Sequence, residues 1–209
     1  MNLLGHHEIA RRLNDERDYS YLFSSMAPDF FGMFKVRRSN TANTSINAGL
    51  ALHQATDNVF DELALVKELQ ASMTASFKEF LPRWTAVQCA GVGKDILFDG
   101  IHFSHELKIL AYGRTMLFAV RGNAGIADMA EPTQQWMERL RWFEEMGIPR
   151  YDDPFVVADL LQRRLKGTRS EFDASFIPEL GANLAQHQIV VNEIGQVVVE
   201  SIVERLSAQ

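Results

Sequence analysis

Apolar residues recur along most of the chain at intervals of three and four positions, and strict alternation of apolar and polar residues is rare. This spacing is typical of helices that bury one face. Prolines and polar stretches separate the periodic segments and mark where helices end. The pattern predicts an all-α fold with helices at about 2–13, 18–34, 44–80, 84–121 (as one or two helices), 132–146, 154–166 and 179–206. Within the last range, the three valines at 197–199 would also suit a strand.

Polar residues interrupt the apolar face of four of these helices. A buried carboxylate usually lies beside a cation, a metal ion or several hydrogen-bond donors, because burying it alone is costly. In the third helix, one face carries residues at intervals of four, three, four and three positions: Ile46, Leu50, His53, Asp57 and Phe60. Equivalent interruptions in the other three helices fall at His6, Asp29 and Asp95.

Imidazole and carboxylate groups that converge between helices are the means by which helical bundles hold divalent ions. Oxygen ligands favour manganese, magnesium or iron, and nitrogen ligands widen the choice. We therefore predict a divalent-metal site built from these histidines and aspartates. The alternative is a buried hydrogen-bond network in a helical binding protein without catalytic activity. His102 and His105 form a further pair, at i and i+3, which suits either metal ligands or the polar surface of a helix.

The composition narrows the class of protein. With 209 residues the chain can bury one substantial core, and we expect a single α-helical domain. Cys89 is the only cysteine, so an internal disulfide is impossible, which fits a cytoplasmic protein. The formal net charge of -6 argues against nucleic acid as the main partner. We expect no membrane partner, because no apolar stretch reaches about 18 residues.

One segment departs from this acidic average. Residues 30–56 contain no aspartate or glutamate, whereas Lys35, Arg37 and Arg38 lie close together. Such a cluster of cations can hold a phosphate group or meet an acidic protein surface. A solvated basic loop is the plainer interpretation, and the sequence leaves both open.

Three short segments form a recognisable pattern. Residues 2–6 read Asn-Leu-Leu-Gly-His, and residues 25–30 read Ser-Met-Ala-Pro-Asp-Phe. Residues 48–61 begin with Ala-Gly and then carry, at four-residue intervals, His53, Asp57 and Asp61. In order and approximate separation, these segments resemble the acyl carrier protein phosphodiesterases, a divergent branch of the HD-domain metal-dependent phosphohydrolases.

The resemblance covers about residues 1–105, the metal-site half, whereas residues 106–209 form a divergent helical half without an alignable motif. It implies an HD-domain-like helical bundle and a bound manganese or similar divalent ion. It also implies hydrolysis of the phosphopantetheine phosphodiester of holo acyl carrier protein. By position, the residues at or beside the metal would be His6, Asp29, His53, Asp57 and Asp95.

The chemistry of such a site suggests two further roles. A carboxylate that the metal leaves free, Asp57 or Asp61, would take the proton of the attacking water. Asp61 can equally be a surface residue beside Glu62. The phosphate, or the acidic surface of a carrier protein, would be met by Lys35, Arg37 or Arg38.

The chain also differs from the family that it resembles. Ala51 stands where the family helix usually has a second histidine, Gln54 where it has an arginine, and Ile96 where a histidine often follows the later aspartate. A second enzyme interpretation therefore keeps the metal and changes the substrate to a nucleotide or another small phosphoester.

Overall fold

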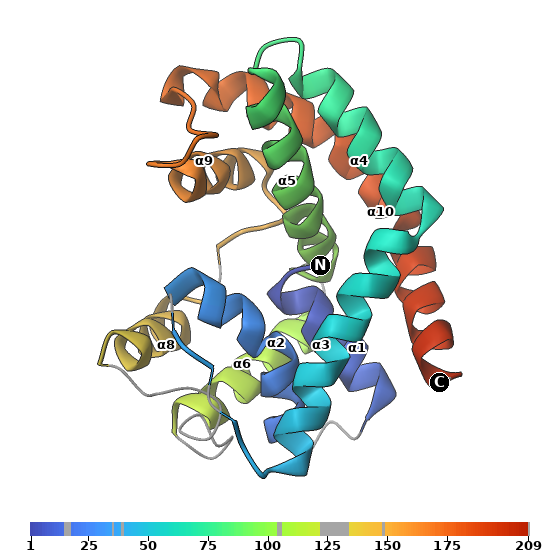
Figure 1. The fold of residues 1–209 in the computed structure, drawn as a ribbon, viewed down its shortest axis with the longest axis vertical. Coiled ribbons are helices and arrows are strands. Elements are labelled where there is room, and N and C mark those ends of the chain that lie inside the picture. Colours follow the sequence, from blue (N-terminus) through green and yellow to red (C-terminus); the bar gives the residue numbers. More distant parts are fainter. Residues whose placement is uncertain are drawn as a thin grey trace. The chain divides into compact units, whose positions relative to one another are not determined.

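The computed structural model describes residues 1–14, 18–34, 36–38, 40–103, 106–121, 134–147 and 149–208. These residues form an all-α fold without a strand, as the sequence predicts (Figure 1). In chain order, the elements are α1 (Leu3–Leu13), α2 (Tyr19–Phe34), α3 (Thr44–Glu62), α4 (Ala64–Phe77), α5 (Arg83–Phe103), α6 (Glu106–Val120), α8 (Gln134–Met146), α9 (Pro154–Leu165), the 3-10 helix η1 (Ala174–Phe176) and α10 (Ile177–Ser207). Within the described ranges, no helix is both long and apolar enough to span a membrane.

The helix boundaries follow the apolar spacing with two refinements. The segment predicted at 44–80, with little or no break near Phe60, is two helices, because Leu63 leaves helical geometry with a ψ of 130° between α3 and α4. The three valines at 197–199 lie inside α10, so the strand interpretation is wrong. Residues 122–131, which separate the predicted helices at 84–121 and 132–146, lie outside the described residues.

The apolar spacing that includes Asp95 also predicts Trp84 on the buried face of α5, and this is wrong, because the Trp84 side chain is 55% exposed. Small residues one position further round the helix are buried instead, and they let neighbouring helices approach closely. They are Thr85, Ala86, Cys89, Ala90 and Gly93.

The chain divides into two compact units, and each takes segments from both halves of the sequence. The first unit comprises Met1, Phe60–Ser104 and Pro149–Ser201. The second comprises Asn2–Val59, His105–Ile148 and Ile202–Gln209. The halves that the resemblance defines are therefore a feature of the sequence pattern, and neither half corresponds to one unit.

In the first unit, α4 packs against α5, and α5 packs against α9. Phe60 and Phe98 meet edge to face at 5.0 Å between ring centroids. A Cβ atom at Gly100 would collide with the backbone of Tyr151, so only glycine permits this approach of α5 to the segment before α9. The close packing around α5 fixes the side chains that this helix carries.

In the second unit, α1 packs against α2 and α6, and α6 also packs against α2 and α8. Every residue from Leu3 to Ala10 is buried, so α1 is enclosed on all sides rather than on one face. A Cβ atom at Gly49 would collide with the Ser24 side chain and the Tyr21 carbonyl. Glycine at this position therefore lets α3 approach α2 closely enough for side chains of both helices to meet.

Candidate metal centre

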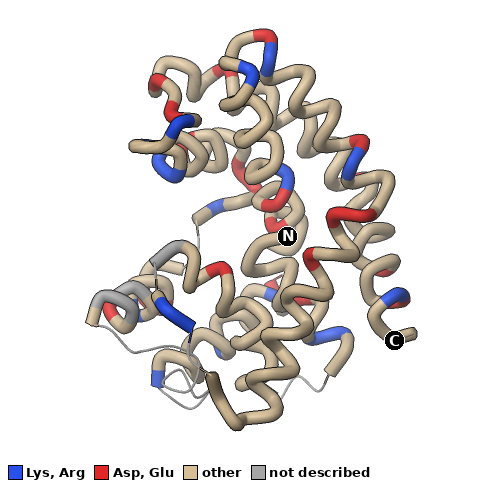
Figure 2. Tube along the Cα trace, viewed as in Figure 1, with Lys and Arg blue, Asp and Glu red and all other residues tan. Residues whose placement is uncertain are grey.

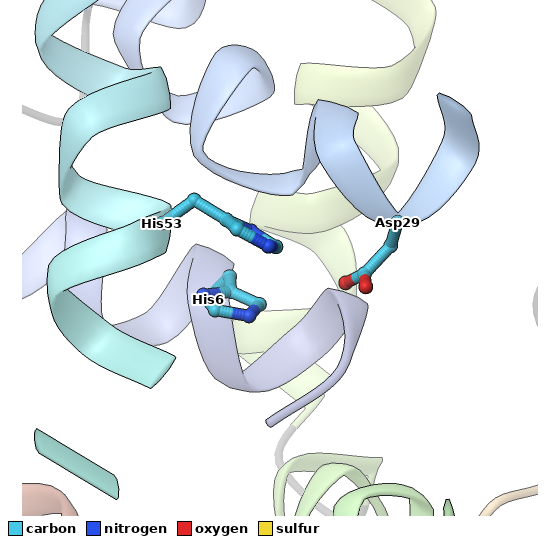
Figure 3. A group of neighbouring side chains, drawn as sticks. All are labelled: His6, Asp29 and His53. Carbon is cyan, nitrogen blue, oxygen red and sulfur yellow. The ribbon is translucent and has the colours of Figure 1, made fainter. Parts of the chain in front are cut away.

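Three helices of the second unit bring His6, Asp29 and His53 together (Figure 3). His6 comes from α1, Asp29 from α2 and His53 from α3. One ligand atom of each side chain lies within 4.8 Å of those of the other two. Around an ion with ligands at about 2.1 Å, adjacent ligand atoms are about 3 Å apart and opposite ones about 4.2 Å. The three side chains are therefore close enough to share one divalent ion after small adjustments.

Asp57 belongs to the same cluster. It follows His53 by one turn of α3, and its carboxylate contacts both imidazoles. The distances are 3.2 Å from Oδ1 to His6 Nε2 and 3.3 Å from Oδ2 to His53 Nε2. The side chain of Asp57 is 32% exposed, whereas that of His6 is fully buried. The cluster thus reaches solvent through its carboxylate.

The orientation of His53 is fixed by a backbone hydrogen bond. Its Nδ1 atom lies 2.8 Å from the carbonyl oxygen of Ser25 on α2. A carbonyl oxygen can only accept, so Nδ1 carries the proton and donates it. The neutral ring therefore presents the lone pair of Nε2 toward Asp57. This arrangement is common among metal-binding histidines, because the second ring nitrogen is held by a backbone carbonyl or a carboxylate.

His6 is the most enclosed member of the cluster. Its ring stacks on that of His53 with 3.8 Å between centroids and an interplanar angle of 24°. Apart from the 3.2 Å contact of Nε2 with Asp57, its ring nitrogens have no hydrogen-bond partner among the described residues. Buried polar atoms normally have a partner, so these nitrogens indicate a missing one. A metal ion would be a suitable partner for such an atom.

The protonation states suit a cation. Burial lowers the pKa of His6 to about 3, so its imidazole is neutral at pH 7 and able to bind a metal. Burial alone would raise the pKa of Asp57, but the adjacent imidazoles hold it well below its usual value. Burial alone would lower the pKa of His53, but Asp57 and Asp29 outweigh it and raise that pKa. A bound ion would therefore compete with protons more at His53 than at His6.

The remaining predicted acidic residues, Asp61 and Asp95, lie in the first unit. The buried ammonium group of Lys94 is 2.9 Å from Asp61 Oδ1 and 2.7 Å from Asp95 Oδ1. The amino terminus at Met1 lies 3.4 Å from the same oxygen of Asp95. We call these four groups the Lys94 cluster. The structure thus places Asp61 and Asp95 against cations, and Asp61 is largely exposed, as the surface interpretation predicts.

Sequence reasoning missed the buried acidic residue of α5. Asp99 is fully buried and His102 nearly so, whereas the side chain of Asp95 is 30% exposed. Following the small buried residues Cys89 and Gly93 by helical steps leads through Ile96 to Asp99, so the signal was present. The small residues on this face bury little apolar area, so the large apolar residues of α5 dominate its hydrophobic pattern. His102 is therefore not part of an exposed polar surface, and His105 lies outside the described residues.

The three basic residues predicted to bind phosphate are not equivalent. Arg38 lines a cavity of about 420 Å³ that His53 also lines. Arg37 is exposed, and Lys35 lies outside the described residues. Figure 2 shows a blue stretch in the described residues that connect α2 to α3. Arg38 is therefore the cation that the structure places beside the candidate metal centre.

No family model, no curated protein and no solved structure matches this chain. The functional conclusion therefore rests on the geometry of the cluster and on the sequence pattern.

Proposed function

We propose that this protein is a divalent-metal-dependent phosphoester hydrolase. Its metal would be held by His6, Asp29, His53 and Asp57. The observation that carries the proposal is the cluster of His6, Asp29 and His53 from three helices, with Asp57 in contact with both imidazoles. Within the described part of the chain, the buried His6 ring has no hydrogen-bond partner other than the Asp57 contact. The resemblance implies manganese, and the carboxylate donors also suit the alternatives magnesium and iron.

Each residue of the site has a task in such a reaction. When bound, a divalent ion supplies Lewis acidity toward a phosphoryl oxygen and makes a water molecule acidic enough to attack phosphorus. The Ser25 carbonyl orients His53, and the oxygen of Asp57 that the ion leaves free would accept the proton of that water at the solvent edge of the cluster. The Arg38 guanidinium supplies donors for the phosphoryl oxygens. Asp61 stays a second predicted base, and its carboxylate contacts Lys94.

The resemblance of the first half supports a carrier protein as substrate, with release of phosphopantetheine from holo acyl carrier protein. The acid-free segment 30–56 would then meet the acidic surface of the partner. Replacement of Arg37 and Arg38 by glutamate should raise KM for the carrier protein and flatten its salt dependence.

The alternative of a small phosphoester is favoured by one observation. Ala51 and Gln54, two of the positions at which the chain differs from the family, both line the cavity beside His53. Absence of phosphopantetheine release, together with metal-dependent cleavage of nucleotides or simple phosphodiesters, would select this alternative.

Metal binding is the decisive experiment for the proposal. Protein dialysed against a chelator should take up about one manganese ion per chain, and its Tm should rise by about 5–10 °C at saturating metal. Hydrolysis of bis(p-nitrophenyl) phosphate should appear only with the metal. A matched control is His187→Gln, which changes a buried histidine of the first unit that contacts Ser72. Protein that takes up no metal and gains no stability would refute the proposal and favour the non-catalytic binding protein.

A further inference from the structure

The cavity beside His53 has two chemically different walls. Its apolar wall is formed by Pro28, Phe31, Leu50 and Ala51, and its polar wall includes Arg38 and Gln54. The volume of about 420 Å³ lies in the range of small-molecule sites, which are mostly apolar with a few placed polar groups. We call this space the Arg38 cavity.

The charge of the Arg38 cavity is positive. Among the residues that the structure describes, no aspartate or glutamate lines it, and Arg38 makes no ion pair or hydrogen bond with any of them. An exposed guanidinium without a carboxylate partner keeps all its donors for an anion. The site therefore fits a ligand that carries a negative charge near Arg38 and an apolar group near Phe31.

The polar wall is held in place by the amides of Asn47 and Gln54. The Asn47 side chain donates to the Thr41 carbonyl at 2.9 Å, and the Gln54 side chain donates to Asn58 at 3.0 Å. Both amides are neutral, so this wall adds no second charge. The cavity is thus formed before a ligand arrives, which reduces the entropic cost of binding.

We infer that the Arg38 cavity is the subsite for the organic substituent of a singly charged phosphodiester, and that Ala51 determines which substituents fit. This inference rests on the proposed function, because the reacting phosphoryl group would lie at the metal centre that His53 shares with the cavity. Arg38 binds a phosphoryl oxygen, and an aromatic or branched apolar substituent packs against Phe31 and Leu50. The small side chain of Ala51 leaves room in the cavity for this substituent. Because Gln54 is neutral, it offers no charge to a second anionic group, and such a group is disfavoured.

Two anions that cannot be hydrolysed test this inference by calorimetry on metal-loaded protein. Diphenylphosphinate and dimethylphosphinate carry the same charge, and their carbon–phosphorus bonds resist hydrolysis. The diphenyl probe should bind about ten-fold tighter or more, because at least one ring leaves water. Ala51→Trp should abolish that preference and keep the affinity for the dimethyl probe. Arg38→Gln should weaken both probes by about five-fold.

The chain offers matched controls. Ala48 and Ala51 are exposed residues of α3, and both line a second cavity, but only Ala51 lines the Arg38 cavity. Ala48→Trp should therefore change neither affinity, and neither should Arg141→Gln on the exposed face of α8. An unchanged manganese content of each variant shows that the metal centre is intact.

The outcomes separate the two proposals. Equal affinities for the two probes, or a preference that survives Ala51→Trp, would overturn the subsite even if phosphoesters are hydrolysed. The expected binding pattern in a protein that hydrolyses no phosphoester would support the subsite and refute the proposed function.

Discussion

The two compact units each contain a cluster of acidic side chains, and the two clusters neutralise their charge differently. In the first unit, the carboxylates of Asp61 and Asp95 contact the fixed ammonium group of Lys94. In the second, Asp57 contacts the imidazoles of His6 and His53, and one of these, His6, is neutral at pH 7. The first cluster supplies its own cation, whereas the second has room for a cation from solution.

An aspartate that interrupts the apolar face of a helix can thus contact either a lysine or an imidazole. A lysine with a pKa raised by two neighbouring carboxylates stays charged at every physiological pH, so the Lys94 cluster needs nothing further. An imidazole changes charge easily, and a metal ion competes with its proton. The histidine-rich cluster is therefore the one suited to reversible binding and to catalysis, and the Lys94 cluster is suited to stability.

The largest expected effect comes from removal of the metal-centre side chains, and it tests the contrast between the two clusters. His53→Ala and Asp29→Ala should each lower phosphodiester hydrolysis by at least about 1,000-fold, because the metal would lose a ligand. Both variants should also lose the manganese-dependent rise in Tm. Enzyme assays beside elemental analysis and circular dichroism measure these effects.

Cys89→Ala is the control for that experiment, since Cys89 is buried in the first unit and its raised pKa, about 12, makes it unreactive. It should keep its metal and nearly full activity. Retained hydrolysis in both metal-centre variants would show that the active site lies elsewhere. The two clusters would then not differ in their role in catalysis.

The next largest effect is the response of the metal-free protein to acid. The pKa of His6 falls from 6.5 in the unfolded chain to about 3 in the folded one. Between these values the unfolded state binds more protons, so stability falls as the pH falls below 6.5. We expect a loss of about 3 kcal/mol between pH 7 and pH 4, measured by urea unfolding in the presence of a chelator.

The neighbouring residues act in other pH ranges. The raised pKa of His53 gives stability that is complete below 6.5 and is lost as the pH rises through the folded value. The lowered pKa of Asp57 gives stability that is lost only in acid below its ordinary value of 3.8. His6→Phe should therefore remove most of the acid dependence above pH 4. An unchanged slope in that variant would show that His6 is not the buried neutral group.

Helical periodicity was sufficient to predict the all-α fold and nearly all helix ranges, because most helices bury large apolar residues on one face. It also identified His6, Asp29, His53 and Asp57, since each interrupts an apolar face. It did not separate Asp95 from these residues. Whether a carboxylate meets an imidazole or a lysine depends on contacts between helices, and the Lys94 side chain, next to Asp95 in sequence, gave no periodic signal of being buried.

The face of α5 was misjudged for a related physical reason. Small residues bury little apolar area, so Cys89 and Gly93 contribute weakly to any hydrophobic pattern, although they permit the closest helix packing. The same holds for Gly49, whose role is visible only when α2 and α3 are seen in contact. Sequence therefore indicated the chemistry of the site better than the packing that positions it.

The smallest expected effect concerns the Lys94 cluster, and it tests whether that cluster is only structural. Lys94→Met keeps the apolar stem that packs beside Phe60, where the ammonium group lies 4.6 Å from the ring centroid, and removes the charge. Asp61 and Asp95 are both partly exposed and can be hydrated when the ammonium group is lost. We therefore expect a modest loss of about 1–2 kcal/mol in the free energy of unfolding.

The control is Lys67→Met, at an exposed position of α4, which should change the free energy of unfolding by less than about 0.5 kcal/mol. Both variants should keep the manganese content and the activity of the unmodified protein. A loss of metal in Lys94→Met, but not in Lys67→Met, would show that Asp61 or Asp95 supports the metal after all, as the resemblance implies for Asp95.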